Sequence, residues 1–305
     1  MTSAQKADSS LPPFRRKCDE PNRKPRGSRL IHKSEDSAHA ATHKRINVIV
    51  DGSVSTHLSV ATWNLQRVAS RSWKKLPAIH RRMEAVSADI WVLTETRSSI
   101  TPGGAYCGIH SPAHLSRRPD ADERWVSVWS RWPIQTANVR VSPWSVTGIV
   151  HSPFGRLIIH GMVLPYRHEP TNVAGESPVW AEFSRELSLQ AQDWVAVRHQ
   201  HGGLPLIVVG DFNQNLDGAQ WYGTPATRRQ LALGLDVAGL RCLTMDDAVA
   251  TGRLRRNHLV DHVCVSTDLA PAGEFDCWEP LAEDGKAISD HPGVVARLRA
   301  VMDGD

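Results

Sequence analysis

Apolar residues along the chain fall into short runs, and amphipathic segments lie between them. Runs rich in β-branched and aromatic residues predict seven strands, at residues 58–65, 89–95, 125–130, 156–164, 204–210, 258–266 and 293–299. Apolar positions at helical spacing predict three helices. The first contains Leu76, Ile79, Met83 and Val86, the second runs from about Val179 to Val195, and the third covers 226–240 and closes near Gly239.

Several of these strands follow each other too closely for a crossover helix. Antiparallel pairing must therefore be common, because a parallel connection needs a dozen or more residues. This excludes an all-parallel doubly wound sheet. The element order instead favours an α/β (α+β) protein in which two sheets are sandwiched between outer helices, in a single domain over residues 56–305.

The composition is that of a soluble globular protein, with 41% hydrophobic and 22% charged residues. No apolar run approaches the roughly 18 residues of a membrane span, and the first residues have no apolar segment typical of a secretory signal. The five cysteines are scattered, without a Cys-x-x-Cys pair. We therefore expect reduced thiols, a cytoplasmic location and no structural zinc.

The formal charge of +4 is unevenly distributed. Residues 1–56 contain eleven Lys/Arg and six Asp/Glu, whereas the rest of the chain has a net charge of −1. Residues 1–55 are rich in Ser, Pro, Lys and Arg and show no period, so they predict a disordered basic tail. The tail is either a passive leader or an arm that contacts nucleic acid. The domain itself has no overall positive field that would indicate nucleic acid.

Five separate segments place a carboxylate or a carboxamide at the edge of an apolar strand. One such residue is ordinarily a turn or cap residue, but five together indicate that polar side chains gather at one rim of the core. They are Asn64, Glu95, Asp211 with Asn213, Asp261, and Asp290 with His291.

Such a rim predicts a hard divalent cation. Gathered acids repel each other, and their pKa values rise unless a cation holds them. Oxygen ligands favour Mg²⁺ or Mn²⁺ over zinc. His291 adds a group that can transfer a proton or donate a hydrogen bond. Together these groups predict a site for phosphate-ester hydrolysis.

The motifs "TWNL", "LTET", "VVGDFNQ", "LVDHVCVS" and "SDHPGV" stand in an order and spacing that resemble the endonuclease/exonuclease/phosphatase superfamily. This superfamily includes deoxyribonuclease I, abasic-site endonucleases, sphingomyelinases and inositol polyphosphate 5-phosphatases. The resemblance covers about residues 57–299. It implies a four-layer α/β/β/α sandwich with two mixed, largely antiparallel sheets, which agrees with the element order.

The resemblance also implies roles for the rim residues. Glu95 resembles the principal metal ligand, helped by Asn64 and Asp290. Asp211 resembles the acid that activates or orients the attacking water. The mechanism implied is direct in-line attack without a covalent enzyme intermediate, driven by positioning and electrostatic stabilisation. Asn213 resembles the amide that contacts the scissile phosphate. Asp290 and His291 resemble an acid–imidazole dyad, and Asp261 resembles the acid that supports this edge of the site.

This chain departs from the pattern in two places. Many members have an acid two residues after the first Asn, but here that position is Gln66. The amide carries no charge, which would weaken metal affinity. Members also often present a His or Tyr just before a Pro in the middle strand. Here the candidates for binding substrate are Tyr166 and His160, on either side of Pro165.

Two further segments are candidates for substrate contact. Trp221 and Tyr222 follow the "GDFNQNLDG" segment, and there they either stack on a base or sugar or pack within a loop. Arg253, Arg255 and Arg256 lead into the strand of Asp261. They either bind a backbone phosphate or form a solvated basic turn.

The sequence thus predicts a monomeric, divalent-metal-dependent phosphodiesterase, with DNA or RNA as the commonest substrate of the family. "LTET" replaces the "LQE" of abasic-site endonucleases, which argues against a repair role. One alternative is a phosphomonoesterase or a lipid or inositol phosphate hydrolase that takes a small phosphorylated substrate. The other is a pseudoenzyme that binds nucleic acid or a partner. Only Gln66 supports this alternative.

Overall fold

The computed structural model describes residues 48–50, 53–55, 57–69, 71–113, 122–169 and 178–300. All of the described residues lie in one compact unit, Ile46–Asp305. Most of the predicted basic tail lies outside the described residues, so its disorder stays a prediction. Near its end the structure has a hairpin of β1 (Val48–Val50) and β2 (Ser53–Ser55), which the sequence pattern did not reveal.

The first sheet has the strand order β13-β15-β3-β4-β6-β5, and β14 pairs with β15. Only β3 and β4 run parallel to each other; every other pair in this sheet is antiparallel. The strands are β3 (Leu58–Asn64), β4 (Ile90–Arg97), β5 (Cys107–His110), β6 (Glu123–Ser130), β13 (Leu269–Pro271), β14 (Asp276–Trp278) and β15 (Gly293–Ala300).

The second sheet has the order β11-β12-β10-β9-β8-β7, with β9 and β10 as its parallel pair. Both sheets are therefore mixed and largely antiparallel, as predicted. The strands are β7 (Ile134–Thr136), β8 (Ser145–Ser152), β9 (Gly155–Val163), β10 (Leu206–Asp211), β11 (Leu240–Cys242) and β12 (Asp261–Ser266).

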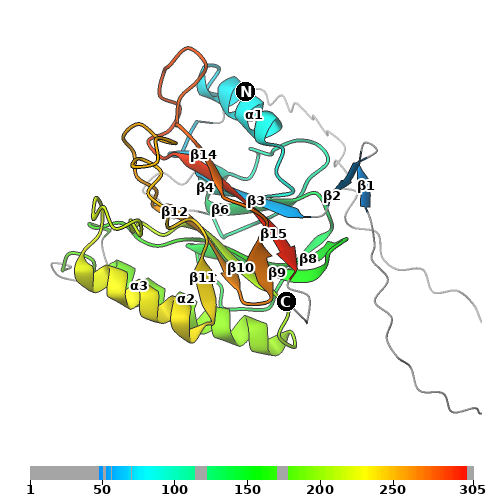
Figure 1. Cartoon of the computed structure of the whole chain (residues 1–305), viewed down its shortest axis with the longest axis vertical. Helices are drawn as coiled ribbons and strands as arrows, with labels where there is room; N and C mark the ends of the chain where they lie inside the picture. Colours follow the sequence, from blue (N-terminus) through cyan, green and yellow to red (C-terminus); the bar gives the residue numbers. More distant parts are fainter. Residues whose placement is uncertain are drawn as a thin grey trace, which may run out of the picture. The chain divides into compact units, whose positions relative to one another are not determined.

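The three helices in the described part of the chain form the outer layers (Figure 1). Helix α1 (Lys75–Val86) packs Ile79 and Met83 onto the first sheet. Helices α2 (Ala181–Gln200) and α3 (Pro225–Val237) cover the second sheet, with Phe183, Trp194 and Leu231 fully buried beneath them. The order of layers is helix, sheet, sheet, helix, which confirms the predicted sandwich.

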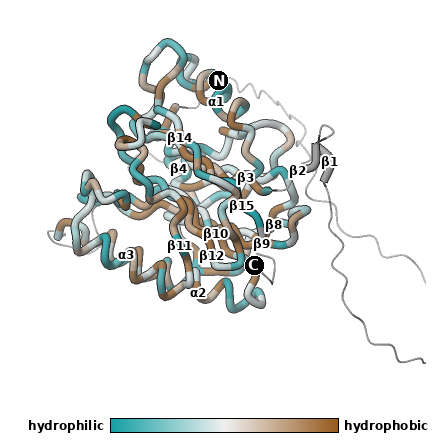
Figure 2. The backbone as a smooth tube through the Cα atoms, in the orientation of Figure 1, coloured by the Kyte–Doolittle hydropathy of each residue, from teal (hydrophilic) through white to brown (hydrophobic). Residues whose placement is uncertain are grey.

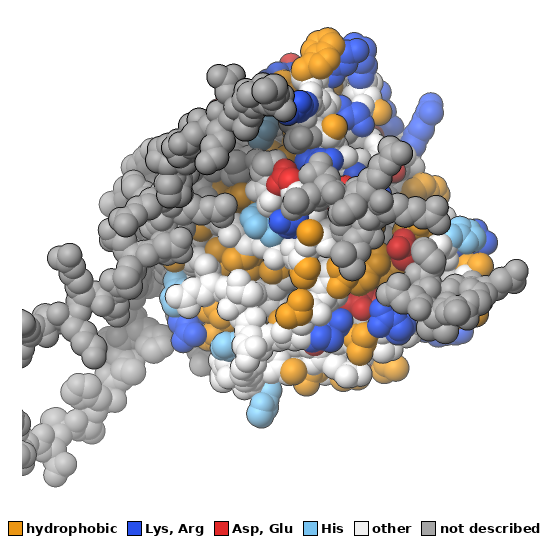
Figure 3. Space-filling view, turned by 180° about the vertical axis from the view of Figure 1, so that it is seen from behind, with side chains coloured by type: hydrophobic (Ala, Val, Ile, Leu, Met, Phe, Trp, Pro, Cys, Tyr) orange, Lys and Arg blue, Asp and Glu red, His pale blue; other side chains and the backbone are white. Residues whose placement is uncertain are grey.

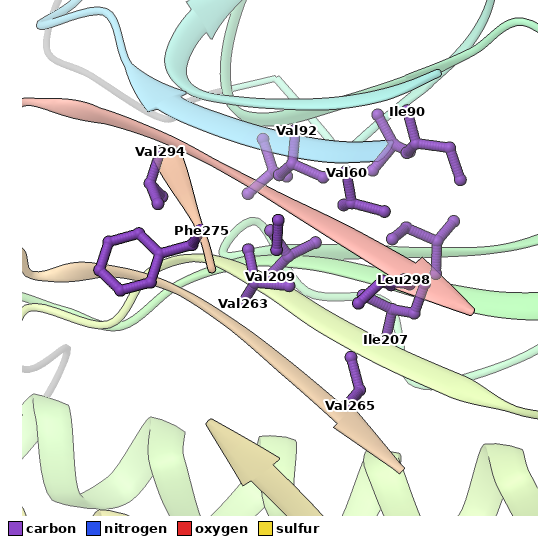
Figure 4. Close-up of a cluster of buried hydrophobic side chains, with 14 of the residues drawn as sticks. Val60, Ile90, Val92, Ile207, Val209, Val263, Val265, Phe275, Val294 and Leu298 are labelled. Atoms are coloured by element: carbon purple, nitrogen blue, oxygen red, sulfur yellow. The ribbon is translucent and has the colours of Figure 1, made fainter. Parts of the chain in front are cut away.

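The main core lies between the two sheets. Its side chains alternate along facing strands, such as Val60 and Val92 from the first sheet and Val209 and Val263 from the second (Figure 4). The strands at the centre of the molecule are its most hydrophobic part (Figure 2). Each buried aliphatic side chain contributes about 1.5–3 kcal/mol. Because this core clamps β3, β4, β10 and β12 face to face, the ends of these strands meet at one rim.

Cys242, Cys264 and Cys277 are free thiols. Over the part of the chain that the structure describes, none of the helices combines the length and apolarity needed to cross a membrane.

Candidate active site

Strand register brings the predicted acids together. Asn64 ends β3 opposite Thr94, so Glu95 lies one residue beyond the parallel ladder of β3 and β4. In the second sheet Asp211, the last residue of β10, is the direct antiparallel partner of Asp261, the first residue of β12. Directly opposed carboxylates repel each other. The fold therefore forces a like-charge pair onto the rim.

The backbone is strained at three rim positions. Gly210 has φ +143°, and a Cβ atom there would lie 2.0 Å from the carbonyl oxygen of Met162, so only glycine can precede Asp211. Glu95 and Asn213 adopt φ +44° and +48°. Such left-handed conformations are unfavourable for residues with side chains and concentrate at functional sites. They turn both side chains out of the sheet ladders.

Asn64 bridges the two sheets. Its Nδ2 donates to Glu95 Oε1 (3.2 Å) and to Asp211 Oδ2 (3.1 Å). Its Oδ1 accepts the peptide N–H of Gln66 at 2.8 Å, while the Gln66 side chain is exposed. Asn64 therefore acts here as a donor that positions two carboxylates.

Asn213 holds Asp211 from the other side. Its peptide N–H donates to Asp211 Oδ1 (2.9 Å), and its Nδ2 donates to Asp211 Oδ2 (3.2 Å) and to the carbonyl of Leu164 (2.8 Å). Since an amide nitrogen has two hydrogens, both are used within the protein. In this arrangement Asn213 fixes the orientation of Asp211, and the predicted contact of the amide with phosphate stays a prediction.

The acid partner of His291 is Asp261, which corrects the predicted Asp290–His291 dyad. The distance from His291 Nδ1 to Asp261 Oδ2 is 2.6 Å. Asp290 is exposed at the mouth of the site, where its charge acts on Glu95. With Nδ1 bound to Asp261, the opposite ring nitrogen of His291 is left for a ligand.

Two residues that the sequence did not single out fix the position of His291. Trp63 Nε1 donates to the carbonyl of His291 (2.9 Å). The hydroxyl of Ser289 donates to the Asn64 carbonyl (2.6 Å) and accepts the His291 peptide N–H (3.1 Å). Only the position of Ser289 at the start of "SDH" offered a signal for this bridge.

The electrostatics follow from burial and from the unmatched acids. Burial, and then repulsion by Asp261, raises the pKa of Asp211 to about 7. Burial also raises the pKa of Glu95, although the hydrogen bond from Asn64 acts to lower it. Burial alone would lower the pKa of His291, but the carboxylates of Asp261 and Asp211 outweigh it and raise this pKa to about 10.

The residues present fit a divalent cation. Asp261 Oδ1 is buried and has no hydrogen-bond partner among the described residues, although buried polar atoms are normally paired. Ligand atoms of Asp211, Asp261 and His291 all lie within 4.8 Å of one another. Carboxylate oxygens in excess over local cations suit a hard divalent ion. The predicted metal chemistry therefore has a matching donor set.

Of the two candidates for substrate contact around Pro165, the structure favours Tyr166 and excludes His160. Tyr166 is 43% exposed, and partial burial and the charges of Glu169 and Glu95 raise its pKa; its contact with substrate stays a prediction. His160 is buried under α2, with Nδ1 2.8 Å from Thr147 Oγ1 and Nε2 3.3 Å from Gln190 Oε1. Its side chain points to the helix layer, so it is a core residue, and burial lowers its pKa to about 4.

The remaining candidates lie in loops. Trp221 is exposed in the loop between β10 and α3. Arg253 packs on Phe275, 4.2 Å from the ring centroid, and donates to its carbonyl, so it has a structural role. The side chain of Arg255 is exposed, and its contact with phosphate stays a prediction.

Comparison with known proteins identifies the fold and the family. No curated protein matches the chain. Among solved structures, an endonuclease/exonuclease/phosphatase from Beutenbergia cavernae DSM 12333 is 17% identical, with a TM-score of 0.56 over 81% of this chain and 72% of the other. The AP endonuclease LMAP from Leishmania major is 12% identical, with a TM-score of 0.58 over 84% and 92%. The endonuclease domain of TRAS1, a telomere-specific non-LTR retrotransposon, is 17% identical, with a TM-score of 0.53 over 80% and 99%.

At these identities the structures show a shared fold. The sequence of residues 61–291, more than half of the chain, matches the Endonuclease/Exonuclease/phosphatase family and contains every rim residue described above. These two observations agree with the motifs and with the layered architecture. The chain therefore belongs to the Endonuclease/Exonuclease/phosphatase family, whose members are hydrolases of phosphate esters.

Proposed function

We propose that the protein is a divalent-metal-dependent phosphodiesterase that cleaves DNA or RNA by direct attack of water. The observation that carries the proposal is the pair of buried carboxylates, Asp211 and Asp261, beside His291, with one Asp261 oxygen unpaired among the described residues. In a cluster of acids that only supports the fold, paired cations would be expected to balance these charges. This one is left open to an ion and to an anionic substrate.

We assign the cation to the acidic rim, with Glu95 and Asp290 as its predicted ligands, Asn64 holding Glu95 in place, and the unpaired oxygen of Asp261 as a further acceptor on the same rim. A bound Mg²⁺ or Mn²⁺ ion would neutralise charge on the phosphate and polarise its oxygens. Asp211 is fixed by Asn64 and Asn213, so it can orient the attacking water and accept its proton. A pKa of about 7 suits a general base at neutral pH.

His291 has the complementary role. Its Asp261 partner keeps it protonated near neutral pH, so it can donate a hydrogen bond from the opposite ring nitrogen to a phosphate oxygen. Such a donor stabilises the negative charge that develops in the transition state. Tyr166 is the further group that we place against the phosphate, and Arg255 a group for a flanking one.

Nucleic acid is the substrate that the neighbouring structures favour, since two of them are endonucleases by name. Lys and Arg side chains are scattered over the face seen in Figure 3 and do not gather in one patch. We further propose a cytoplasmic, monomeric enzyme.

Full-length protein incubated with Mg²⁺, Mn²⁺ or EDTA would test the proposal. The substrates are single- and double-stranded DNA, an abasic duplex, RNA, a nitrophenyl phosphodiester, inositol phosphates and sphingomyelin, with His291→Ala as the contamination control. We expect metal-dependent cleavage of a nucleic acid that is lost in the variant. Cleavage only of inositol phosphates or sphingomyelin would reject the nuclease. Binding of nucleic acid without any turnover would point to a pseudoenzyme.

A further inference from the structure

The loop between β10 and α3 presents an aromatic surface beside the rim. Trp221 is 55% exposed. Its ring centroid lies 6.1 Å from that of Tyr222 and 6.1 Å from that of His258, with ring planes inclined by 45° and 34°. Packing on these two neighbours holds the indole in place and leaves about half of it open to solvent.

The loop backbone is bent to present this ring. Gly218, Gln220 and Gly223 have φ values of +84°, +55° and +97°. Gln220 immediately precedes Trp221 and has a side chain, for which a left-handed conformation is unfavourable. Local strain of this kind persists only where the surroundings enforce it, and it clusters at ligand sites.

A brace of hydrogen bonds enforces the bend. Asp217 Oδ1 accepts from Asn215 Nδ2 (2.6 Å) and from the Ala219 peptide N–H (2.9 Å). Asn215 Oδ1 in turn accepts the peptide N–H of Trp221 at 3.0 Å. The other oxygen of Asp217 lies 2.7 Å from His258 Nδ1. One buried carboxylate therefore fixes both the loop and the imidazole beside the indole.

Both rings come from segments adjacent to the catalytic residues. Trp221 follows Asn213 in the same loop, and His258 precedes Asp261 by three residues. Tyr222 connects them to the rim, because its carbonyl accepts the peptide N–H of Asn215, two residues after Asn213, at 3.1 Å. Its hydroxyl accepts the peptide N–H of Arg167 at 3.4 Å, and the Arg167 side chain is exposed. An aromatic surface, a cation and the reactive carboxylates thus occupy neighbouring positions.

We propose that Trp221 and His258 form a stacking platform for a nucleobase of the substrate, with Asp217 as the residue that positions both rings. The inference rests on the phosphodiesterase proposed above and narrows its substrate to base-containing phosphate esters. A base offers a flat π face to an indole, and stacking of this kind tolerates any base sequence. An inositol headgroup has no aromatic ring for such contact. The platform would place the scissile phosphate of a nucleotide next to Asp211 and His291.

Calorimetric binding of AMP and of ribose 5-phosphate to the full chain with Mg²⁺ would test the platform, because the two ligands differ only in the base. We expect AMP to bind about tenfold more tightly, the lower part of the range for stacking on one aromatic side chain. Trp221→Ala should abolish this preference and leave the affinity for ribose 5-phosphate unchanged, while Trp221→Phe should retain most of it. Leu233→Ala, at an exposed position of α3, is the control and should retain all of it.

The Asp217→Ala variant tests whether Asp217 positions the two rings, and the quantity measured is again the ratio of the affinities for AMP and ribose 5-phosphate. We expect the preference for AMP to fall several-fold with little change for ribose 5-phosphate. An equal loss of both ligands would show that Asp217 only supports the fold and would reject its positioning role. Equal affinity of the wild-type protein for the two ligands, or a preference that survives in Trp221→Ala, would overturn the platform.

Phosphate-ester hydrolysis measured on the same samples separates the two proposals. Metal-dependent hydrolysis without a preference for AMP would leave the phosphodiesterase standing and reject the platform. A preference for AMP that depends on Trp221, in a protein that cleaves none of the substrates tested, would support the platform and reject the enzyme.

Discussion

Two regions of this protein bury carboxylates, and they balance the charge in opposite ways. Beneath α2, Glu186 and Asp193 share the guanidinium of Arg140, whose nitrogens lie 2.9 Å from an oxygen of each. Ser142 and Gln190 donate further hydrogen bonds to the same oxygen of Glu186, at 3.0 and 3.2 Å. Buried acids in this network have a cation and several donors.

At the rim the acids outnumber their cation, which is the protonated His291 beside Asp261. Asp211 and Asp261 face each other in register, their hydrogen-bond donors from side chains are amides and one histidine, and burial with mutual repulsion raises the pKa of Asp211 to about 7. Arg67, whose charge acts on Glu95, pairs with Glu123. The same chain matches charges where they support the fold and leaves them unmatched where an ion and a phosphate would bind.

The largest difference expected between the regions is in catalysis. Glu95→Ala, Asp211→Ala and His291→Ala should each lower kcat by about 10²–10⁴-fold, because each removes a group that acts on the ion, the water or the phosphate. Glu186→Gln, in the matched network, should leave kcat within about twofold. Steady-state kinetics on the substrate found by the panel, with circular dichroism of each variant, would measure this. Wild-type rates in the three rim variants would place the active site elsewhere.

The free energy of unfolding should instead depend more on the network beneath α2 than on the rim. Arg140→Ala removes the cation that Glu186 and Asp193 share and leaves Glu186 with the more distant Arg185, 3.5 Å away. This should lower the free energy of unfolding by about 3–5 kcal/mol. The control is Arg297→Ala, whose partner Asp276 lies 2.9 Å away in an exposed pair and for which a loss of about 0–1 kcal/mol is expected. Urea denaturation measures both. Equal losses would mean that the buried network is no more stabilising than a surface pair.

Much of this arrangement was predictable because strands with long apolar runs carry a strong signal. All seven predicted strands exist, and each polar residue at a strand end reached the rim. The strands that were missed have a weak pattern. β7 has three residues, two of them exposed, and β8 contains Gly148, where a Cβ atom would lie 2.6 Å from a side-chain carbon of Ile109. A close packing contact selects that glycine, and nothing local in the sequence reveals it.

Pairings over long sequence distances were the part that could not be predicted. The sequence placed Asp290 beside His291, and chain proximity suggested a dyad. The true partner, Asp261, is thirty residues away and is brought close only by the packing of β12 against the first sheet. The orientation of His160 could not be predicted for a related reason, because the face to which a strand residue points depends on strand register.

The pH dependence of stability should follow from the unmatched charges. In metal-free protein, Asp211 and His291 both have folded-state pKa values, about 7 and about 10, above their ordinary values of 3.8 and 6.5. The folded state therefore holds more protons than the unfolded state over this range. Stability should fall as the pH rises through it, by about 1–3 kcal/mol between pH 5 and 8.

Urea denaturation in EDTA at pH 5 and pH 8 would measure this fall. Asp261→Asn should reduce it, because the substitution removes the charge that raises both pKa values while an oxygen remains for His291. Added Mg²⁺ should stabilise the protein more at pH 8 than at pH 5, since the cation binds the ionised carboxylates. A stability that rises with pH in EDTA would contradict this account of the rim.

The smallest effect expected concerns the acid that this chain lacks. Gln66 is exposed next to Asn64, and its peptide N–H already holds the Asn64 oxygen, so Gln66→Glu would add one negative charge at the mouth of the site without disturbing that hydrogen bond. An added charge near a solvent-exposed ion contributes about 1 kcal/mol, which corresponds to roughly a fivefold lower Kd for Mg²⁺. Calorimetric titration of Mg²⁺ into the variant would measure it, with Gln135→Glu on the exposed part of β7 as the control for a general change in charge. An unchanged Kd in Gln66→Glu would mean that the cation lies too far from this position to sense it, and that the amide does not weaken the metal site.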